Sequence, residues 1–219
     1  MFILSALLCL SASAQTVTLS PLPQEITWGE IAFSNDTEFY LVGADMADQD
    51  AVEALSNQLQ IAGRSEKVNK KLYPDARPII IGEYGDKAVA KFRKSIPEVE
   101  EGYYLDVTPG QVVIAGRDGR GTFYGVQTFL QLLKPSKVMQ CRVVDYPSVS
   151  ERGVIEGFYG NPWSHTDRLR QFEFYGQNKL NTYVYGPKDD PYHRARWRVP
   201  YPEKEASQLK ELIVAAHKN

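Results

Sequence analysis

Two adjacent carboxylates near the end of the chain are the first residues whose types suggest catalysis. Asp189 and Asp190 follow Lys188 at the end of an apolar run. A glycosidase needs two carboxyl groups with different roles at a set separation. Neighbouring residues of a strand point to opposite faces, which argues against both carboxylates acting on the same bond of a substrate. Because Pro187 and Pro191 flank the pair, we expect a loop in which the aspartates cap turns or hold neighbouring Arg and Lys side chains.

A lysine and a glycine turn are better candidates for contacts with a ligand. Lys188 carries three N–H donors on a flexible stem and could hold a sugar hydroxyl or an acid; a solvated surface lysine is the alternative. In EGFYGNPW, Gly157 would let a ligand approach the backbone closely. Tyr159 would add an aromatic face and a phenol group. The alternative for this segment is a tight turn whose aromatic side chains pack into the core.

A second glycine-rich segment, GRDGRGTFYG at residues 116–125, resembles a phosphate-binding helix start. It lacks the Gly-Lys-Ser/Thr ending of a P-loop and follows a predicted hairpin. We therefore expect a turn that opens a helix.

Cysteine and histidine residues give no support to a metal site. Beyond the N-terminal segment Cys141 is the only cysteine, and the three histidines are scattered without metal-ligand spacing. The sequence thus predicts no disulfide, no metal and no cofactor. Cys141 lies in the apolar run VMQCRVVDY, where a buried structural thiol is expected.

Composition and charge exclude some classes of partner. The chain has 219 residues, 25 Lys and Arg against 27 Asp and Glu, and a formal net charge of -2. A basic face for nucleic acid has no support in these numbers. Hydrophobic residues make up 43% of the chain, as in an ordinary globular protein.

The N-terminal segment MFILSALLCLSASAQ predicts an export signal at residues 1–14. It has a short apolar core and a small-residue cleavage site, although a positively charged leader is missing. It is too short for a membrane span, and Leu8 before Cys9 disfavours a lipid anchor. We expect a periplasmic or extracellular protein; a buried N-terminal strand or helix is the alternative.

Residues 15–149 mix predicted strands with two helices. TVTLS, IAF, EFYLV and RPIIIGEYG predict strands, and GYYLDVTPGQVVIAGRD predicts a hairpin. A first helix is indicated by apolar residues at helical spacing: Ala51, Leu55, Leu59 and Ala62. A second is indicated in the same way by Phe123, Val126, Leu130 and Leu133, with Pro135 ending it. A sheet covered by two helices, an α+β arrangement, accounts for this domain.

Residues 150–219 follow a Pro- and Ser-rich junction near Ser148 and show a different order of predicted elements, in which strands alternate with helices. RGVIEGFYG and TYVYGPKDD predict strands. A helix with a capping box follows the first, and a helix with early Pro202 follows the second. The order strand, helix, strand, helix predicts the first two βα units of a (β/α)₈ barrel. Eight strands do not fit in this length, so we expect a fragment.

The segment RGVIEGFYGNPWSHTDRLRQFEFYGQNKLNTYVYGPKDDPYHRARWRVPYP resembles the start of the catalytic barrel in family-84 glycoside hydrolases. These are the β-N-acetylglucosaminidases that include bacterial and animal O-GlcNAcases and clostridial enzymes called hyaluronidases. Upstream, EGYYLDV, GRDGRGTFYGVQTFLQLL and DYPSVSERG resemble the α/β domain that precedes the barrel in families 84 and 20. The resemblance covers essentially the whole chain after its N-terminal segment.

The resemblance implies retaining hydrolysis of terminal β-linked N-acetylglucosamine (GlcNAc), with the 2-acetamido group of the substrate as nucleophile. It implies that the Gly157 carbonyl and Lys188 contact sugar hydroxyls and that Tyr159 lines the pocket. The family's own adjacent aspartates belong to a later motif, which this sequence does not contain, so Asp189 and Asp190 are not that pair. The resemblance thus predicts an inactive piece of an enzyme that acts on GlcNAc-containing glycans or glycoproteins. A non-catalytic carbohydrate-binding module is the alternative.

Overall fold

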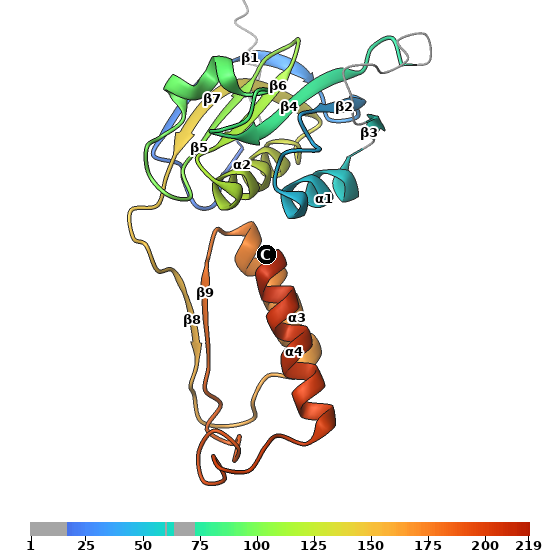
Figure 1. Ribbon diagram of the computed structural model, residues 1–219. Coiled ribbons are helices and arrows are strands. Elements are labelled where there is room, and N and C mark those ends of the chain that lie inside the picture. The colour runs from blue at the N-terminus through green and yellow to red at the C-terminus, as the bar shows by residue number, and fades with distance from the viewer. Residues whose placement is uncertain (1–16, 60, 64–72) are drawn as a thin grey trace, which may run out of the picture.

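A seven-stranded mixed sheet forms the larger part of the protein, seen here in a computed structural model (Figure 1). The structure describes residues 17–59, 61–63 and 73–219, so the predicted export signal at 1–14 lies outside the described residues. In spatial order the strands are β1 (Glu25–Ser34), β7 (Lys137–Asp145), β5 (Tyr103–Val107), β6 (Val112–Gly116), β4 (Arg77–Glu83), β2 (Phe39–Val42) and β3 (Ile61–Gly63).

The sheet has an antiparallel half and a parallel half. Strands β1, β7, β5 and β6 pair antiparallel, whereas β6, β4, β2 and β3 pair parallel. The predicted hairpin is β5–β6, and its turn is closed by the amide of Thr108, which donates to the carbonyl of Gln111 at 3.0 Å. The parallel strands need crossover connections, and helix α1 (Gln49–Gln58) lies in the connection from β2 to β3.

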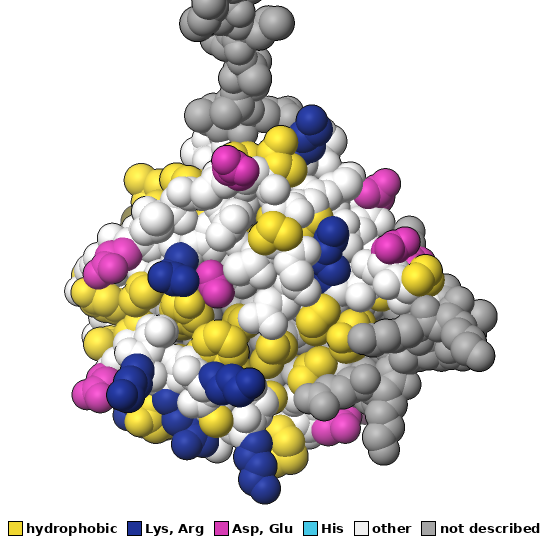
Figure 2. Space-filling model, turned by 90° about the horizontal axis from the view of Figure 1, so that it is seen from above, with side chains coloured by type: hydrophobic (Ala, Val, Ile, Leu, Met, Phe, Trp, Pro, Cys, Tyr) yellow, Lys and Arg dark blue, Asp and Glu magenta, His cyan; other side chains and the backbone are white. Residues whose placement is uncertain are grey.

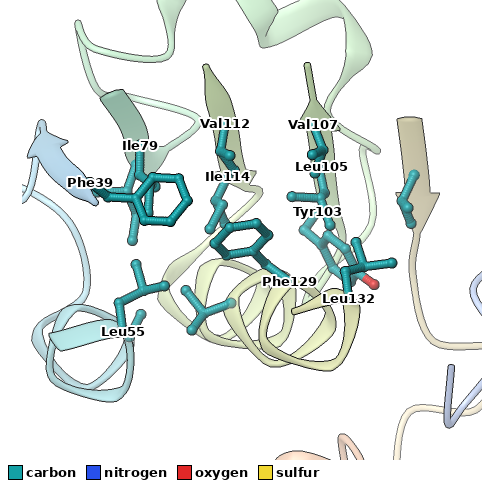
Figure 3. Close-up of a cluster of buried hydrophobic side chains, with 14 of the residues drawn as sticks. Phe39, Leu55, Ile79, Tyr103, Leu105, Val107, Val112, Ile114, Phe129 and Leu132 are labelled. Carbon is teal, nitrogen blue, oxygen red and sulfur yellow. The ribbon is translucent and has the colours of Figure 1, made fainter. Parts of the chain in front are cut away.

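Helices α1 and α2 (Gly119–Leu132) cover one face of the sheet and enclose the main core (Figure 3). Phe129 of α2 and Phe39 of β2 are fully buried and meet edge to face, with ring centres 6.0 Å apart. Figure 3 shows the apolar side chains of the sheet pointing at the two helices. Burying each large side chain contributes about 1.5–3 kcal/mol, so this layer anchors the domain. The predicted sheet covered by two helices is confirmed.

The opposite face of the sheet is covered in part by the short 3₁₀ helix η1 (Ala90–Ser95). A smaller cluster lies beneath it, in which Phe92 stacks on Tyr104 at 6.1 Å. Figure 2 views the protein from this side and shows hydrophobic side chains gathered across the middle, with Lys and Arg residues among them.

Two local predictions were wrong, and a third had the wrong length. The described part of TVTLS forms no strand. IAF is in a strand, as predicted, but it is the end of the longer strand β1. The first helix ends at Gln58, because Leu59 is already extended (φ -121°, ψ 152°) and Ala62 lies in β3. The apolar spacing that predicted a longer helix continues past Gln58 because the following residues form strand β3. A strand of the sheet also needs apolar residues.

Residues 153–218 form a second, smaller unit of two βα repeats: β8 (Gly153–Glu156), α3 (His165–Gln177), β9 (Thr182–Tyr185) and α4 (Glu203–Lys218). Strands β8 and β9 pair parallel, as expected. The predicted capping box is present, since Ser164 and Asp167 bond to each other's backbone amides. A small apolar cluster built around Phe172, Tyr175 and Leu212 joins the helices to the strands. These two strands form a separate sheet, and closure into a barrel stays a prediction.

A buried ion pair joins the second unit to the first domain. Lys179, 6% exposed, places Nζ 2.8 Å from Oδ2 of Asp145 at the end of β7 and 2.9 Å from the hydroxyl of Tyr103. A second bridge lies beside it, where Arg152 donates to Glu101 at 2.6 Å. In Figure 1 the amino ends of β8 and β9 are the ends nearer the first domain.

Candidate functional site

The carboxyl ends of β8 and β9 lie next to each other. Glu156 pairs with Tyr185 as the last residue of each strand, and the amide of Gly186 donates to the Glu156 carbonyl at 3.0 Å. The turn after β8 and the loop after β9 therefore start from the same edge of the small sheet. In α/β structures this edge is where ligands commonly bind.

Lys188 and Tyr159 meet at this edge. The Lys188 ammonium lies 5.7 Å from the centre of the Tyr159 ring, within the range of a cation–π contact. The Tyr159 side chain is 84% exposed, so it is not a core residue. The structure thus brings together two of the three residues proposed from the sequence, which lie 29 positions apart (188 − 159).

Gly157, the third residue, begins the turn that carries Tyr159. Its amide donates to the carbonyl of Ile155 at 3.0 Å. Among the described residues nothing donates a hydrogen bond to the carbonyl of Gly157, which leaves this acceptor available. Beyond it Gly160 has φ +107°, which favours glycine and turns the chain toward Trp163.

Glu156 holds this turn in place, and the sequence analysis missed it. Its side chain is fully buried and accepts two hydrogen bonds from Arg168 of α3, at 2.7 and 2.8 Å. It also accepts from the Tyr183 hydroxyl of β9 and from the Trp163 amide, at 3.2 Å, at the end of the turn. Burial alone would raise the pKa of Glu156. The hydrogen bonds from Arg168 and Tyr183 and the charge of Arg168 outweigh it and lower the pKa.

Asp190 organises the loop after β9. Its carboxylate accepts hydrogen bonds from the Tyr185 hydroxyl at 2.6 Å, the Tyr201 hydroxyl at 2.9 Å and the Tyr192 amide at 2.8 Å. Burial tends to raise the pKa of Asp190, but these three donors lower it. The predicted turn-capping role is seen here, with tyrosines in place of the expected Arg and Lys partners. Its neighbour Asp189 is exposed.

The glycine-rich segment at 116–125 opens helix α2, as expected. Asp118 caps the helix by accepting from the Gly121 amide at 2.8 Å and also accepts from the Glu101 amide at 2.9 Å. A Cβ atom at Gly121 would lie 2.2 Å from the carbonyl oxygen of Gly102. The glycine therefore serves close packing of the helix start on its own chain. Cys141 is buried, and burial raises its pKa to about 12, which confirms the predicted structural thiol.

Lys179, which forms the buried ion pair between the second unit and the first domain, is another residue whose role the sequence did not indicate. It ends α3 in a Schellman arrangement, since its amide donates to Gly176 and the amide of Leu180 donates to Tyr175. Its φ of +60° is a conformation in which glycine is usual. Here the position is filled by a lysine whose ammonium reaches Asp145 at the end of β7.

Two further observations apply to the described part of the chain. No three His, Cys, Asp or Glu side chains there are grouped so as to hold a metal ion. None of its helices is long and apolar enough to cross a membrane.

Comparisons with known proteins identify the family. A family model described as beta-N-acetylglucosaminidase matches residues 152–219, and one described as glycosyl hydrolase family 20, domain 2, matches residues 16–146. The solved structure of CpGH84B superposes with a TM-score of 0.77 at 34% sequence identity, over 93% of this chain and 35% of that one. The chain is a family-84-type N-terminal portion.

Curated relatives agree with the family-84 assignment. Protein O-GlcNAcase of Rattus norvegicus is 52% identical over 64 residues, which are 29% of this chain and 7% of that protein. Beta-hexosaminidase of Porphyromonas gingivalis is 24% identical over 195 residues, 84% of this chain and 23% of that protein. The chain therefore spans only a minor part of these relatives, and it matches the N-terminal portion of the family-84 architecture.

Proposed function

We propose that the protein represented by this chain removes terminal β-linked GlcNAc from glycans or glycoproteins, with retention and with the substrate's 2-acetamido group as nucleophile. The family assignment supports the reaction class. For this chain's own residues, the proposal rests on the contact of Lys188 with the exposed Tyr159 ring, 5.7 Å apart. Two residues before Tyr159 lies the Gly157 carbonyl, to which no described residue donates a hydrogen bond.

Each of the three residues has a separate part in holding the sugar. The Gly157 carbonyl accepts a hydrogen bond from one sugar hydroxyl. The Lys188 ammonium donates to another, as a charged donor that forms stronger hydrogen bonds than a neutral one. Tyr159 forms the wall of the pocket and keeps the lysine close by its ring. The buried Glu156–Arg168 pair fixes the turn on which Gly157 and Tyr159 lie.

Residues 150–219 start the catalytic (β/α)₈ barrel in this proposal, and residues 15–149 form the accessory domain before it. Support comes from the exposed apolar side chains on the two strands, Ile155 at 70% and Val184 at 45%. Parallel sheets are normally covered on both faces, so these side chains suit further barrel strands. Because residues 1–14 resemble an export signal, we also propose that the protein is periplasmic or extracellular.

The chain by itself is proposed to be inactive. The family's catalytic aspartate pair would have to come from sequence other than Asp189 and Asp190, because Asp190 is occupied by two tyrosine hydroxyls and an amide. A carbohydrate-binding module without catalysis is the second candidate. It is favoured by the exposed Tyr159 ring and by the Gly157 carbonyl, which accepts no hydrogen bond from the described residues.

An aryl β-GlcNAc substrate tests the proposal on two proteins: the 219-residue chain and a chain that continues through the later aspartate motif. We expect turnover by the longer chain only. Turnover by the 219-residue chain that Asp189→Asn abolishes would overturn the assignment. Calorimetry with GlcNAc distinguishes the second candidate, because binding by the 219-residue chain without turnover by either protein favours the module.

A further inference from the structure

A cleft of about 730 Å³ lies between the first domain and the ends of α3 and α4. Its walls come from α1 and α2 on one side and from the last turns of α3 and α4 on the other. Figure 1 shows these helix ends below α1 and α2, at the opposite end of α3 from the loops that follow β8 and β9. The volume is within the range of small-ligand sites, about 300–1,000 Å³.

Gln127 of α2 is the most informative residue in this cleft. Its side chain is only 7% exposed, and among the described residues no hydrogen bond to its amide group is found. Among the described residues the buried side-chain polar atoms without a partner are the Tyr124 hydroxyl and Nδ1 of His165, so the Gln127 amide atoms are not enclosed but open to the cleft. A polar ligand in the cleft can bond to them in place of water.

The other walls suit an uncharged ligand rich in hydroxyl groups. Phe174, 57% exposed, offers an aromatic face. Asn57, Gln58 and Gln177 add amide side chains that make no hydrogen bond to other described residues. The cleft also carries charge: Lys218 bonds to Glu53 at 3.1 Å, and the other charged side chains of the lining are Asp50, Glu173 and Lys134. Amide groups that both donate and accept, beside an aromatic ring, match the hydroxyls and apolar faces of sugar rings.

We propose that this cleft between α2 and α3 is a second glycan site, which binds a neutral oligosaccharide through Gln127 and Phe174. It is separate from the edge that carries Gly157 and Lys188, and it does not depend on the proposed hydrolysis. Its place at the joint means that a bound glycan contacts both domains at once.

An NMR titration of the 219-residue chain tests the site, with the trisaccharide of β-linked GlcNAc and with cellotriose as probes. We expect the side-chain amide signals of Gln127 to shift during titration with at least one probe. Gln127→Leu should weaken the measured affinity at least tenfold, and so should Phe174→Ser, whose exposed ring is not needed for folding. Gln140→Leu, the same change at an exposed site on β7, should leave the affinity unchanged.

Lys188→Met separates this inference from the proposed function. The cleft proposal expects the Gln127 signals to respond to the probes equally in Lys188→Met and in the unaltered chain. The proposal is wrong if neither probe shifts these signals at millimolar concentration. It is also wrong if binding is lost in Lys188→Met but kept in both Gln127→Leu and Phe174→Ser.

Discussion

The fully buried carboxylate of Glu156 and the guanidinium of Arg168 form a bidentate pair, with N–O distances of 2.7 and 2.8 Å. Glu156 ends β8, and Arg168 lies in the first turns of α3, so the pair closes the βα turn between them. The same carboxylate accepts from the Trp163 amide. The conformation of the turn that carries Gly157 and Tyr159 thus depends on one buried carboxylate.

Arg168→Leu should lower the free energy of unfolding of the second unit by about 3 kcal/mol, because it leaves the Glu156 charge buried and unpaired. Urea unfolding followed by Trp fluorescence measures this, since Trp163 lies in the affected turn. Arg170→Leu changes an exposed arginine of the same helix and should cost less than 0.5 kcal/mol. Equal stability of the two variants would show that the pair does not hold the turn.

Asp190→Asn should destabilise the loop after β9 at neutral pH by about 1 kcal/mol, since charged hydrogen bonds become neutral ones. The folded-state pKa of Asp190 lies below its unfolded value, about 3.9. The stability that Asp190 adds is therefore present above about pH 4 and is lost as the pH falls through the folded-state pKa.

The amide signal of Tyr192, which donates to Asp190, reports this titration directly in NMR spectra between pH 6 and pH 2. We expect a midpoint below about 3.9, and no such titration in Asp190→Asn. Asp189→Asn is the matched control and should leave the Tyr192 titration unchanged. A midpoint above 4.5 in the unaltered chain would contradict the lowered pKa.

Lys179→Met should destabilise the joint between the two domains by about 3–5 kcal/mol, because the Asp145 carboxylate stays buried without its cation. Limited proteolysis at the junction near Ser148 should become faster as the second unit detaches. Lys210→Met replaces an exposed lysine and should change neither stability nor cleavage rate. Unchanged cleavage in Lys179→Met would mean that Arg152 and Glu101 hold the joint without it.

Gly121→Ala should cost about 1–3 kcal/mol, because the added Cβ meets the backbone oxygen of Gly102 at 2.2 Å and the chain must shift. Gly110→Ala, in the open hairpin turn, has no atom within 4 Å of the added Cβ and should be nearly neutral. Thermal unfolding of both variants checks the contrast. If Gly121→Ala were as stable as the unaltered chain, close packing would not explain the glycine at this helix start.

Elements with strong local signals could be predicted from the sequence. The β5–β6 hairpin, the capped start of α3 and the strand around Cys141 each rest on turn residues, caps or apolar runs within a short segment. The end of α1 was missed because the apolar spacing that favours a helix also serves the pairing of β3. The order of the seven strands could not be predicted, because it depends on contacts between distant segments.

The candidate site was predictable only in part, for a related reason. Gly157, Tyr159 and Lys188 follow strands and carry suitable groups, so their positions indicated a role. Glu156 and Lys179 gave no such signal, because their partners Arg168 and Asp145 lie 12 and 34 residues away. A glutamate that ends an apolar strand was the available clue to a buried charge that needs a partner.

The central claim is that Lys188, beside Tyr159 and Gly157, binds the sugar. The most direct test is the kcat/KM of Lys188→Met on an aryl β-GlcNAc substrate, in a chain that continues through the catalytic aspartates. A lost charged hydrogen bond of about 1.5–3 kcal/mol predicts a decrease of roughly 10- to 150-fold, with no decrease in the exposed control Lys204→Met. An unchanged kcat/KM in Lys188→Met would contradict the account.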